Sequence, residues 1–567
     1  MIIKLHIQSV TDMVIPDHRE LSEFDVWNHL RSLQPVAVSN PSRLHTFIHE
    51  ANIELSDYDQ LIHALESQVL EAKSKRDSLQ RHASQVSSLL SPIRRLPTEI
   101  LVKFFECTAN SDFLGRNLLG ANSVWKSQAL RISSVCYRWR TIALDTPQLW
   151  ARFAVDLDPR AGPPLDLFLS RSRECKLGVT ITDIDYYKSL APTLFRSLIA
   201  HSSRWSSLDH HYPHKKVTDL MNEVRELPSL EYVVCPAQGR DTPVLLSKPL
   251  RQCSSLKTVV VRYDHYNKVD ITSLPLDFID CLVFQLSAKG AFNHSLQVLK
   301  SCTEIIKELV YQSVRKAKNR KVIRPVIHTS LGNDVQERIE CRGVRKLTVD
   351  LYHPHGIYPH LQDTFRSLTL PSLIDLQLIG ECDTDSSFEG SWPAHFFDEF
   401  IVRSTCTLTT LTVNLPLSDE DVIASLRHFP YLETLSITEL FTNKKSVADR
   451  GVLAKTVTRS LMDKLTMVDP RSVEPASLVF LPKLRSLRLS VHAHFDADVE
   501  FVGMVKSRWY PFSSGSVDPP SFVHCRLESA VLGIRGRDAE KSVYEPLKVY
   551  DSEGMKIVVK ANGAYVV

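Results

Sequence analysis

The sequence predicts a mixed fold, α+β or an α/β repeat, in which a long helix and a three-helix unit precede a repetitive parallel sheet. Three observations lead to this prediction. A heptad pattern of apolar residues runs through residues 53–91 with neither Pro nor Gly. A compact set of helical patterns occupies residues 92–155. From about residue 156, short leucine-rich segments then return at a nearly constant interval.

The amino-terminal elements are predicted from apolar spacing and from helix breakers. Residues 1–52 give a weak signal, with a possible short helix from Glu20 to Leu33. In residues 53–91, Ser56 is a possible N-cap and Pro92 ends the helix. The a and d positions of the heptads, which we call the seam, alternate there at steps of three and four. They are Leu55, Tyr58, Ile62, Leu65, Val69, Ala72, Arg76, Leu79, Ala83, Val86 and Leu90.

Two interpretations of this heptad helix stay open. It forms either a homodimeric coiled coil or a single long helix laid on the next domain. Arg76 and the small side chains of Ala72 and Ala83 weaken the seam, and this favours the single helix.

Residues 92–155 are predicted to form three helices. Pro97 suits the first position of the first helix, because its missing N–H would be unpaired there anyway. A second helix is expected from Ser127 to Leu144, and Thr146 and Pro147 are expected to cap and begin a third. A unit of about 60 residues buries little surface by itself, so it often depends on a partner.

The next 350 residues carry a repeat. Leu230 and Leu256 lie 26 residues apart, Leu408 and Leu432 lie 24 apart, and Leu484 follows 52 after Leu432. This is the period of leucine-rich repeats, in which one strand and one helix per repeat stack into a solenoid lined by a parallel sheet. We therefore predict an irregular leucine-rich-repeat domain over 156–512, with terminal strands or a cap over 513–567. An ordinary α/β domain with coincidental leucines is the alternative.

The segments that carry this period are LPSLEYVV at Leu227, SLKTVVV at Ser255, RKLTVDL at Arg345, LPSLIDLQL at Leu370, LTTLTVNL at Leu408, LETLSI at Leu432 and LPKLRSLRL at Leu481. Between strands we expect helices, for example in the stretch 419–431.

Composition and charge exclude several functional classes. The 567 residues contain 68 Lys and Arg against 65 Asp and Glu, a formal charge of +3. This balance argues against a nucleic-acid coat protein. No stretch approaches ~18 uninterrupted apolar residues, so no membrane span or membrane partner is predicted. Eleven cysteines are scattered singly without a CxxC pair, which favours a reducing compartment, cytoplasmic or nuclear.

Catalytic and metal-binding motifs were sought as well. The sequence has no GxxxxGK[ST], GxGxxG, HExxH or GxSxG motif and no Cys/His quartet with zinc spacing. We therefore expect no enzyme, no catalytic residue, no cofactor and no metal. Two histidine groups were weighed as metal ligands and interpreted as loop residues: His492, His494, Asp496 and Asp498, and His210, His211 and His214. The basic run 315–324 is more typical of a solvated face than of a nucleic-acid site.

The helical unit resembles a known family. The segments that carry the resemblance are Leu96-Pro97-x-Glu99-Ile100-Leu101, Val135-Cys136-x-Arg138-Trp139-Arg140 and Thr146-Pro147-x-Leu149-Trp150. They are similar to an F-box, as found in the expanded F-box family of mushroom-forming fungi (basidiomycetes), whose members also carry irregular leucine-rich repeats. The resemblance covers about residues 53–510.

The resemblance implies a function and a set of site residues. It implies the substrate-recognition subunit of a Skp-cullin-F-box ubiquitin ligase, which binds a Skp-type adaptor, through it a cullin scaffold, and an unknown protein substrate. We expect Pro97, Leu101 and Trp150 at the partner face and Trp139 in the core. The full set of expected adaptor-binding residues is Leu96, Pro97, Ile100, Leu101, Phe104, Val135, Trp139, Leu149 and Trp150. The alternative is a leucine-rich-repeat scaffold or sensor outside a ubiquitin ligase.

Overall fold

The computed structural model describes most of the chain and divides it into two compact units. The first is Met1–Pro97 and the second is Thr98–Val567. The described residues are 30–31, 41–111, 127–156, 162–182, 192–210, 223–236, 249–250, 252–263, 278–286, 291–313, 338–352, 358–381, 391–440, 455–467, 480–509 and 526–567. Most of the predicted helix from Glu20 to Leu33 lies outside them.

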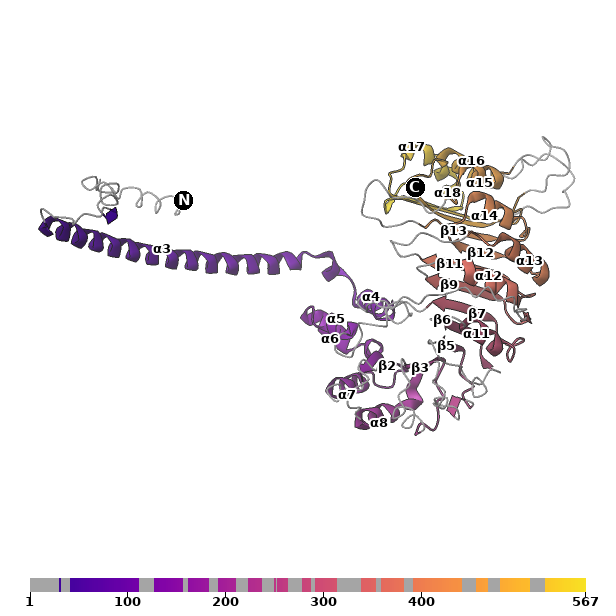
Figure 1. The fold of residues 1–567 in the computed structure, drawn as a ribbon, viewed down its shortest axis with the longest axis horizontal. Helices are drawn as coiled ribbons and strands as arrows, with labels where there is room; N and C mark the ends of the chain where they lie inside the picture. Colours follow the sequence, from indigo (N-terminus) through magenta and orange to yellow (C-terminus); the bar gives the residue numbers. More distant parts are fainter. Residues whose placement is uncertain are drawn as a thin grey trace. The chain divides into compact units, whose positions relative to one another are not determined.

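The first unit is dominated by one helix, α3, which spans Pro41–Leu89 (Figure 1). It begins 12 residues before the predicted start at residue 53, so the proposed N-cap Ser56 lies inside the helix and cannot cap it. Pro41 is acceptable there, because the first helical residue needs no backbone donor. The helix ends shortly before Pro92, and a short 3₁₀ turn, η1 (Pro92–Arg95), follows.

The second unit begins with the helical set α4 (Thr98–Ser111), α5 (Gln128–Ser133), α6 (Tyr137–Leu144) and η3 (Pro147–Trp150). The prediction of one continuous helix from Ser127 to Leu144 is wrong, because Cys136 is extended between α5 and α6. The hydroxyls of Ser133 and Ser134 each bond a carbonyl three residues earlier, and such local bonds compete with the helix. Ser127 caps α5 through the Ala129 N–H, 3.1 Å away.

A large sheet fills the rest of the second unit. Its strands are β1 (Arg152–Asp156), β2 (Leu177–Thr182), β3 (Trp205–His210), β4 (Tyr232–Pro236), β5 (Thr258–Tyr263), β6 (Cys281–Leu286), β7 (Glu308–Ser313), β9 (Lys346–Tyr352), β11 (Asp375–Glu381), β12 (Thr410–Asn414), β13 (Thr434–Thr438), β14 (Ser486–His492), β15 (Ser529–Arg535), β16 (Lys556–Ala561) and β17 (Ala564–Tyr565). Each strand pairs with the next in this order. Every pairing is parallel except the last, between β16 and β17.

The sheet has one apolar face because identical positions of successive strands align. From β7 to β14, one register row consists of Leu309, Leu347, Leu376, Leu411, Leu435 and Leu487. All six side chains are buried. The alternate residues point to the opposite face and are mostly half-buried, as the strand period of two requires. We call this second face the open face.

Helices follow most strands and cover the apolar face. They are α7 (Gly162–Arg171), α8 (Pro192–Ile199), α11 (Ala291–Leu299), α12 (Tyr358–Ser367), α13 (Ala394–Ser404), α14 (Asp419–Leu426), α15 (Arg459–Leu465), α16 (Asp498–Trp509), α17 (Lys541–Tyr544) and α18 (Leu547–Ser552). Consecutive helices from α12 to α16 contact one another, and Figure 1 shows them along one side of the strands. A separate two-stranded pair joins β8 (Ile339–Glu340) and β10 (Leu368–Thr369).

The structure agrees with the predicted positions of the strands. A strand begins within each of the seven leucine-rich segments, and the predicted helix in 419–431 is α14, capped by Ser418. Toward the carboxyl terminus, β15 and β16 continue the sheet across the predicted boundary at residue 512. Among the described residues, no helix has the length and apolar character needed to cross a membrane.

Candidate functional site

The interior of the helical set is built around Trp150. Its side chain is fully buried and its indole N–H donates to the Ala143 carbonyl at 2.8 Å. Its ring contacts Phe168 of α7, with centroids 5.1 Å apart, and the Arg171 guanidinium lies 4.4 Å from the ring centroid. Trp150 therefore joins the helical set to the first helix of the sheet.

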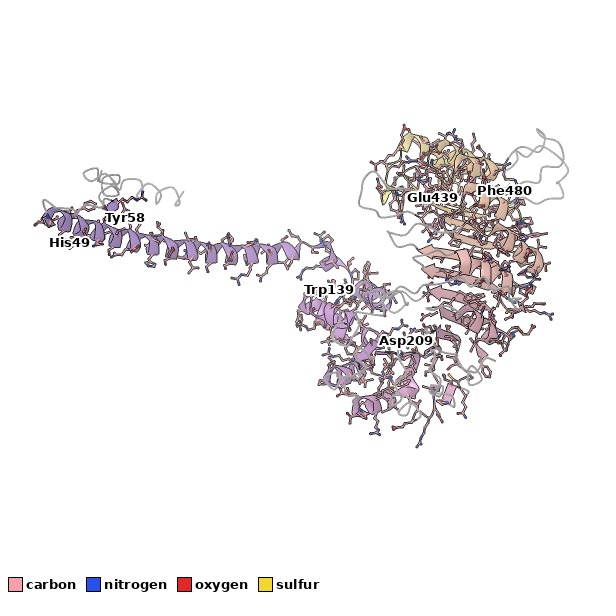
Figure 2. The ribbon with its side chains drawn as sticks, viewed as in Figure 1. His49, Tyr58, Trp139, Asp209, Glu439 and Phe480 are labelled. Carbon is pink, nitrogen blue, oxygen red and sulfur yellow. The ribbon has the colours of Figure 1, made fainter. Side chains whose placement is uncertain are left out.

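This packing corrects part of the expected adaptor face. Leu101 and Trp150 were expected to face a partner, but both are buried within the chain, as is Leu149. The sequence could not reveal this for Trp150, because Phe168 and Arg171, which cover it, come from α7 in the next structural layer. Leu101 lies on α4, which packs against α5, α6 and η3. Trp139 is half-buried against Phe105, with ring centroids 4.8 Å apart. Figure 2 shows Trp139 within the helical set.

The remaining expected residues are more accessible. Leu96 is half-buried and Pro97 is exposed, and both belong to the first unit. In the second unit, the exposed fractions of the side chains are 44% for Ile100, 58% for Phe104 and 60% for Val135. Spacing by itself did not separate these residues from their buried neighbours.

Four exposed residues form what we call the helix patch: Ile100, Phe104, Val135 and Tyr137. Ile100 and Phe104 are four residues apart and therefore share one face of α4. Val135 and Tyr137 flank the break between α5 and α6, and α4 packs against both helices. Tyr137 is 83% exposed and was not among the expected residues. Large apolar side chains left in water on so small a unit are typical of a docking surface.

The open face of the sheet is a second candidate surface. Near its start, Arg262 on β5 lies 3.3 Å from the Asp209 carboxylate on β3 and donates to Gln285 on β6 at 2.8 Å. The Asp209 and Arg262 side chains are largely buried, so pairing offsets the cost of removing their charges from water. Figure 2 marks Asp209 in this part of the sheet.

A charged row crosses the middle of the open face. Lys346 on β9 lies 2.6 Å from Glu308 on β7 and is in register with Asp375 on β11. Burial lowers the pKa of Lys346, but the hydrogen bond and charge of Glu308, together with the charges of Asp375 and Cys281, outweigh burial and the net shift is upward. Burial raises the pKa of Asp375. In the same row, burial raises the pKa of the Cys281 thiol to about 12, so this thiol is a poor nucleophile.

The last strands make the open face basic. The open-face positions of β12 to β16, all of them described, contain no carboxylate. Their cations are Arg488, Arg535, Lys556 and Lys560, and most of their other side chains are hydroxyls. We call this region the basic end of the open face. Cations among hydroxyl donors are suited to bind an anionic segment of a partner protein.

The histidines weighed as metal ligands do not come together as a site. His492 stacks on His494 with ring centroids 6.2 Å apart, and His494 lies 3.4 Å from Glu439. Glu439 is labelled in Figure 2. Asp498 instead pairs with Arg537 at 2.6 Å and accepts a hydrogen bond from Tyr544. Within the described part of the chain, no group of three His, Cys, Asp or Glu side chains could hold a metal ion. His211, His214 and the basic run 315–324 lie outside the described residues.

Comparison with known proteins adds one identification. No curated protein matches the chain. Residues 93–156, which include the whole helical set, match the F-box-like family, so the chain contains an F-box-like domain.

Proposed function

We propose that the chain is the substrate-recognition subunit of a Skp-cullin-F-box ubiquitin ligase. The observation that carries the proposal is the F-box-like match over residues 93–156 together with the helix patch. F-box domains bind Skp-type adaptors, and their proteins are typically adaptors or substrate receptors and not enzymes. The adaptor would connect this chain to a cullin scaffold.

The sheet and its helices would form the irregular leucine-rich-repeat domain. The strand spacing and the unbroken neighbour-to-neighbour parallel pairing support a solenoid of stacked repeats. The open face would bind the protein substrate, with the basic end taking its anionic part. The mechanism would be proximity: a bound substrate is held at high effective concentration near the ubiquitin-conjugating enzyme.

The test is co-purification of the full chain with a fungal Skp-type adaptor. We expect a stoichiometric complex that survives gel filtration. The double variant Ile100→Asp/Phe104→Asp should lose adaptor binding, because it places charge where apolar contacts would be buried. Leu101→Asp and Trp150→Ala are unsuitable as tests, because both residues are interior and the substitutions would disrupt folding.

A matched control is Val402→Asp on α13, whose side chain is 67% exposed on a helix outside the helical set. It makes the same kind of change elsewhere on the second unit and should leave adaptor binding intact. Undiminished adaptor binding by the double variant would refute the role of the helix patch. No binding by the folded wild-type chain would refute the ligase proposal.

The second candidate is a leucine-rich-repeat scaffold or sensor outside a ubiquitin ligase. The burial of Leu101, Leu149 and Trp150 favours it, because three of the nine expected adaptor residues serve the internal packing of the chain. This candidate predicts a folded protein that recovers no adaptor. The adaptor experiment therefore separates the two.

A further inference from the structure

Helix α3 carries a long row of apolar side chains in water. None of its described side chains is buried. Its seam residues Ile62, Leu65, Val69 and Leu79 are between 40% and 70% exposed. α3 has 49 residues, and its apolar seam is in water. Amphipathic helices owe most of their stability to packing of their apolar face, so we expect a partner to cover this seam.

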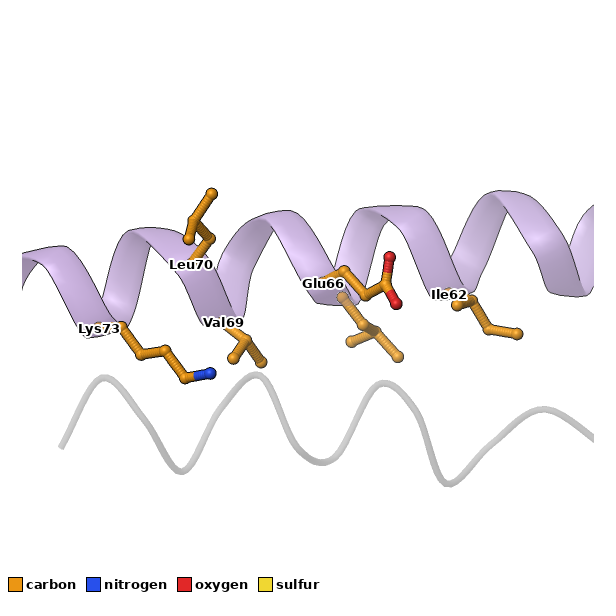
Figure 3. A pocket seen from close by; sticks show the side chains of 6 residues that line it. Ile62, Glu66, Val69, Leu70 and Lys73 are labelled. Carbon is orange, nitrogen blue, oxygen red and sulfur yellow. The ribbon is translucent and has the colours of Figure 1, made fainter.

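The seam has the residue types of a two-stranded coiled coil. If Leu55 is placed at heptad position a, then Ile62 and Val69 also occupy a, and Leu65 and Leu79 occupy d. An apolar seam of this kind packs against the seam of a second helix, and the charges beside it set the orientation of the pair. Figure 3 shows Ile62 and Val69 on one side of α3, whereas Leu70 points to the other side.

Residues 50–89 of α3 consist of an acidic half and a basic half; Arg43 lies in the turns before them. Residues 50–71 contain six Asp and Glu and no Lys or Arg, whereas residues 72–89 contain four Lys and Arg and one Asp. A parallel dimer would align the acidic half with another acidic half. An antiparallel dimer would align each acidic half with a basic half. Opposite charges flanking the seam set the orientation of coiled coils.

We propose that α3 forms an antiparallel two-stranded coiled coil with α3 of a second copy of this chain. One register pairs the a and d positions of the two helices and also aligns acidic with basic residues. Its midpoint lies between residues 70 and 71 of each helix. The facing a and d pairs, named with the residue of one copy first, are Leu55 with Val86, Ile62 with Leu79, Val69 with Ala72, Arg76 with Leu65, and Ala83 with Tyr58.

This register explains the two weaknesses of the seam. Glu66 and Lys73 both occupy position e, and antiparallel packing places each of them opposite the other residue in the second copy. Arg76 lies opposite Leu65 and next to Glu66 of the second copy, so its charge has an acidic neighbour. Ala72 meets the β-branched Val69, so the small side chain faces a larger one. In a parallel dimer, the two Arg76 residues would face each other.

The first experiment measures the mass of the full chain by light scattering after gel filtration. We expect a dimer. Leu79→Asp should convert it to monomer, because it places a carboxylate in the seam opposite Ile62 of the second copy. Leu70→Asp is the matched control: it makes the same change nine residues away, off the seam, and should leave the dimer intact. A monomeric wild-type chain, or equal loss of dimer in the two variants, would overturn the proposal.

The second experiment tests orientation by exchange of charge. Glu66→Lys should weaken the dimer at low ionic strength, because it faces Lys73 of the second copy, and adding Lys73→Glu should restore it. Glu71→Lys is the control, because it removes the 2.5 Å pair with Lys75 within the helix but lies off the seam. Absence of rescue in the double variant would exclude this register.

A photo-crosslinking residue at position 62 provides an independent readout of orientation. We expect crosslinks to the region around Leu79. These must join two chains, because 17 residues along one helix span about 25 Å. Crosslinks to residues around position 62 would show a parallel dimer, and crosslinks to residues 1–40 would show that the chain's own amino-terminal segment covers the seam. Either result would overturn the proposal. Adaptor binding has no part in these measurements, so they can fail or succeed separately from the ligase proposal.

Discussion

Trp150 and Phe104 belong to the same small helical set, but Trp150 is buried and Phe104 is exposed. Trp150 is enclosed by Ala143, Phe168 and Arg171, whereas Phe104 is 58% exposed on α4. Both are large apolar side chains at helical spacing, so the sequence pattern does not show which of them is buried. The difference arises because α7 packs against η3 and covers Trp150, whereas Phe104 lies on the side of α4 that faces solvent.

Trp150→Ala should reduce the free energy of unfolding of the helical set by about 3–5 kcal/mol, as expected when a buried aromatic side chain leaves a cavity. Tyr137→Ala, at an exposed site on the same set, should change it by less than about 0.5 kcal/mol. Urea unfolding followed by tryptophan fluorescence and circular dichroism measures both. Equal destabilisation by the two substitutions would contradict the packing described for Trp150.

At the scale of elements, the helices of the sheet are fixed to the preceding turns by specific polar side chains. Arg508 on α16 is buried, and it donates to the carbonyls of Leu465 at the end of α15 and of Leu481 and Phe480 before β14. Phe480 is labelled in Figure 2. One guanidinium thus satisfies three carbonyls and links two successive helices through the turn before β14. Burial lowers the pKa of Arg508 to about 10.

Arg508→Met should lower the free energy of unfolding by about 3 kcal/mol or more. Methionine fills similar space but removes one donor from each of three carbonyls, of which Leu481 keeps the Leu484 N–H at 3.3 Å. An unsatisfied buried group costs about 1–3 kcal/mol. Lys506→Met, at an exposed position of the same helix, should change stability by less than about 0.5 kcal/mol. Chemical denaturation compares the two, and a neutral Arg508→Met would show that the three carbonyls find other donors.

At the scale of the whole second unit, the edge strand of the sheet presents unpaired N–H and C=O groups that could pair with a strand of another chain. At its carboxyl end, β16 pairs with β15 and carries Lys556 and Lys560, and β17 turns back antiparallel against it. Lysines and a short final strand are common devices against edge-to-edge association. The terminal segment 555–567 therefore protects the sheet.

Deletion of residues 555–567 should expose the edge of β15 and cause concentration-dependent association. Deletion of residues 562–567 should be milder, because it removes only β17, whose two residues are exposed, and leaves the lysines of β16 at the edge. Light scattering across a range of concentrations distinguishes the two. A longer deletion whose mass stays equal to that of the undeleted chain at every concentration would contradict the protective role.

The sequence by itself determined the order and type of most elements in this protein. The seven leucine-rich segments became strands and the heptad segment became a helix, because periods of two and of 3.5 residues are local properties of the chain. The F-box-like resemblance also depended on local motifs, and the match over residues 93–156 agrees with it.

Only the tertiary structure decided which apolar residues are interior and where local patterns stop. Leu101 and Trp150 were expected at a partner face and are buried, since residues distant in the sequence cover them. The helix predicted from Ser127 to Leu144 is two helices, and α3 begins at Pro41 and not near Ser56. Burial depends on which elements pack together, and a single sequence contains no direct record of those contacts.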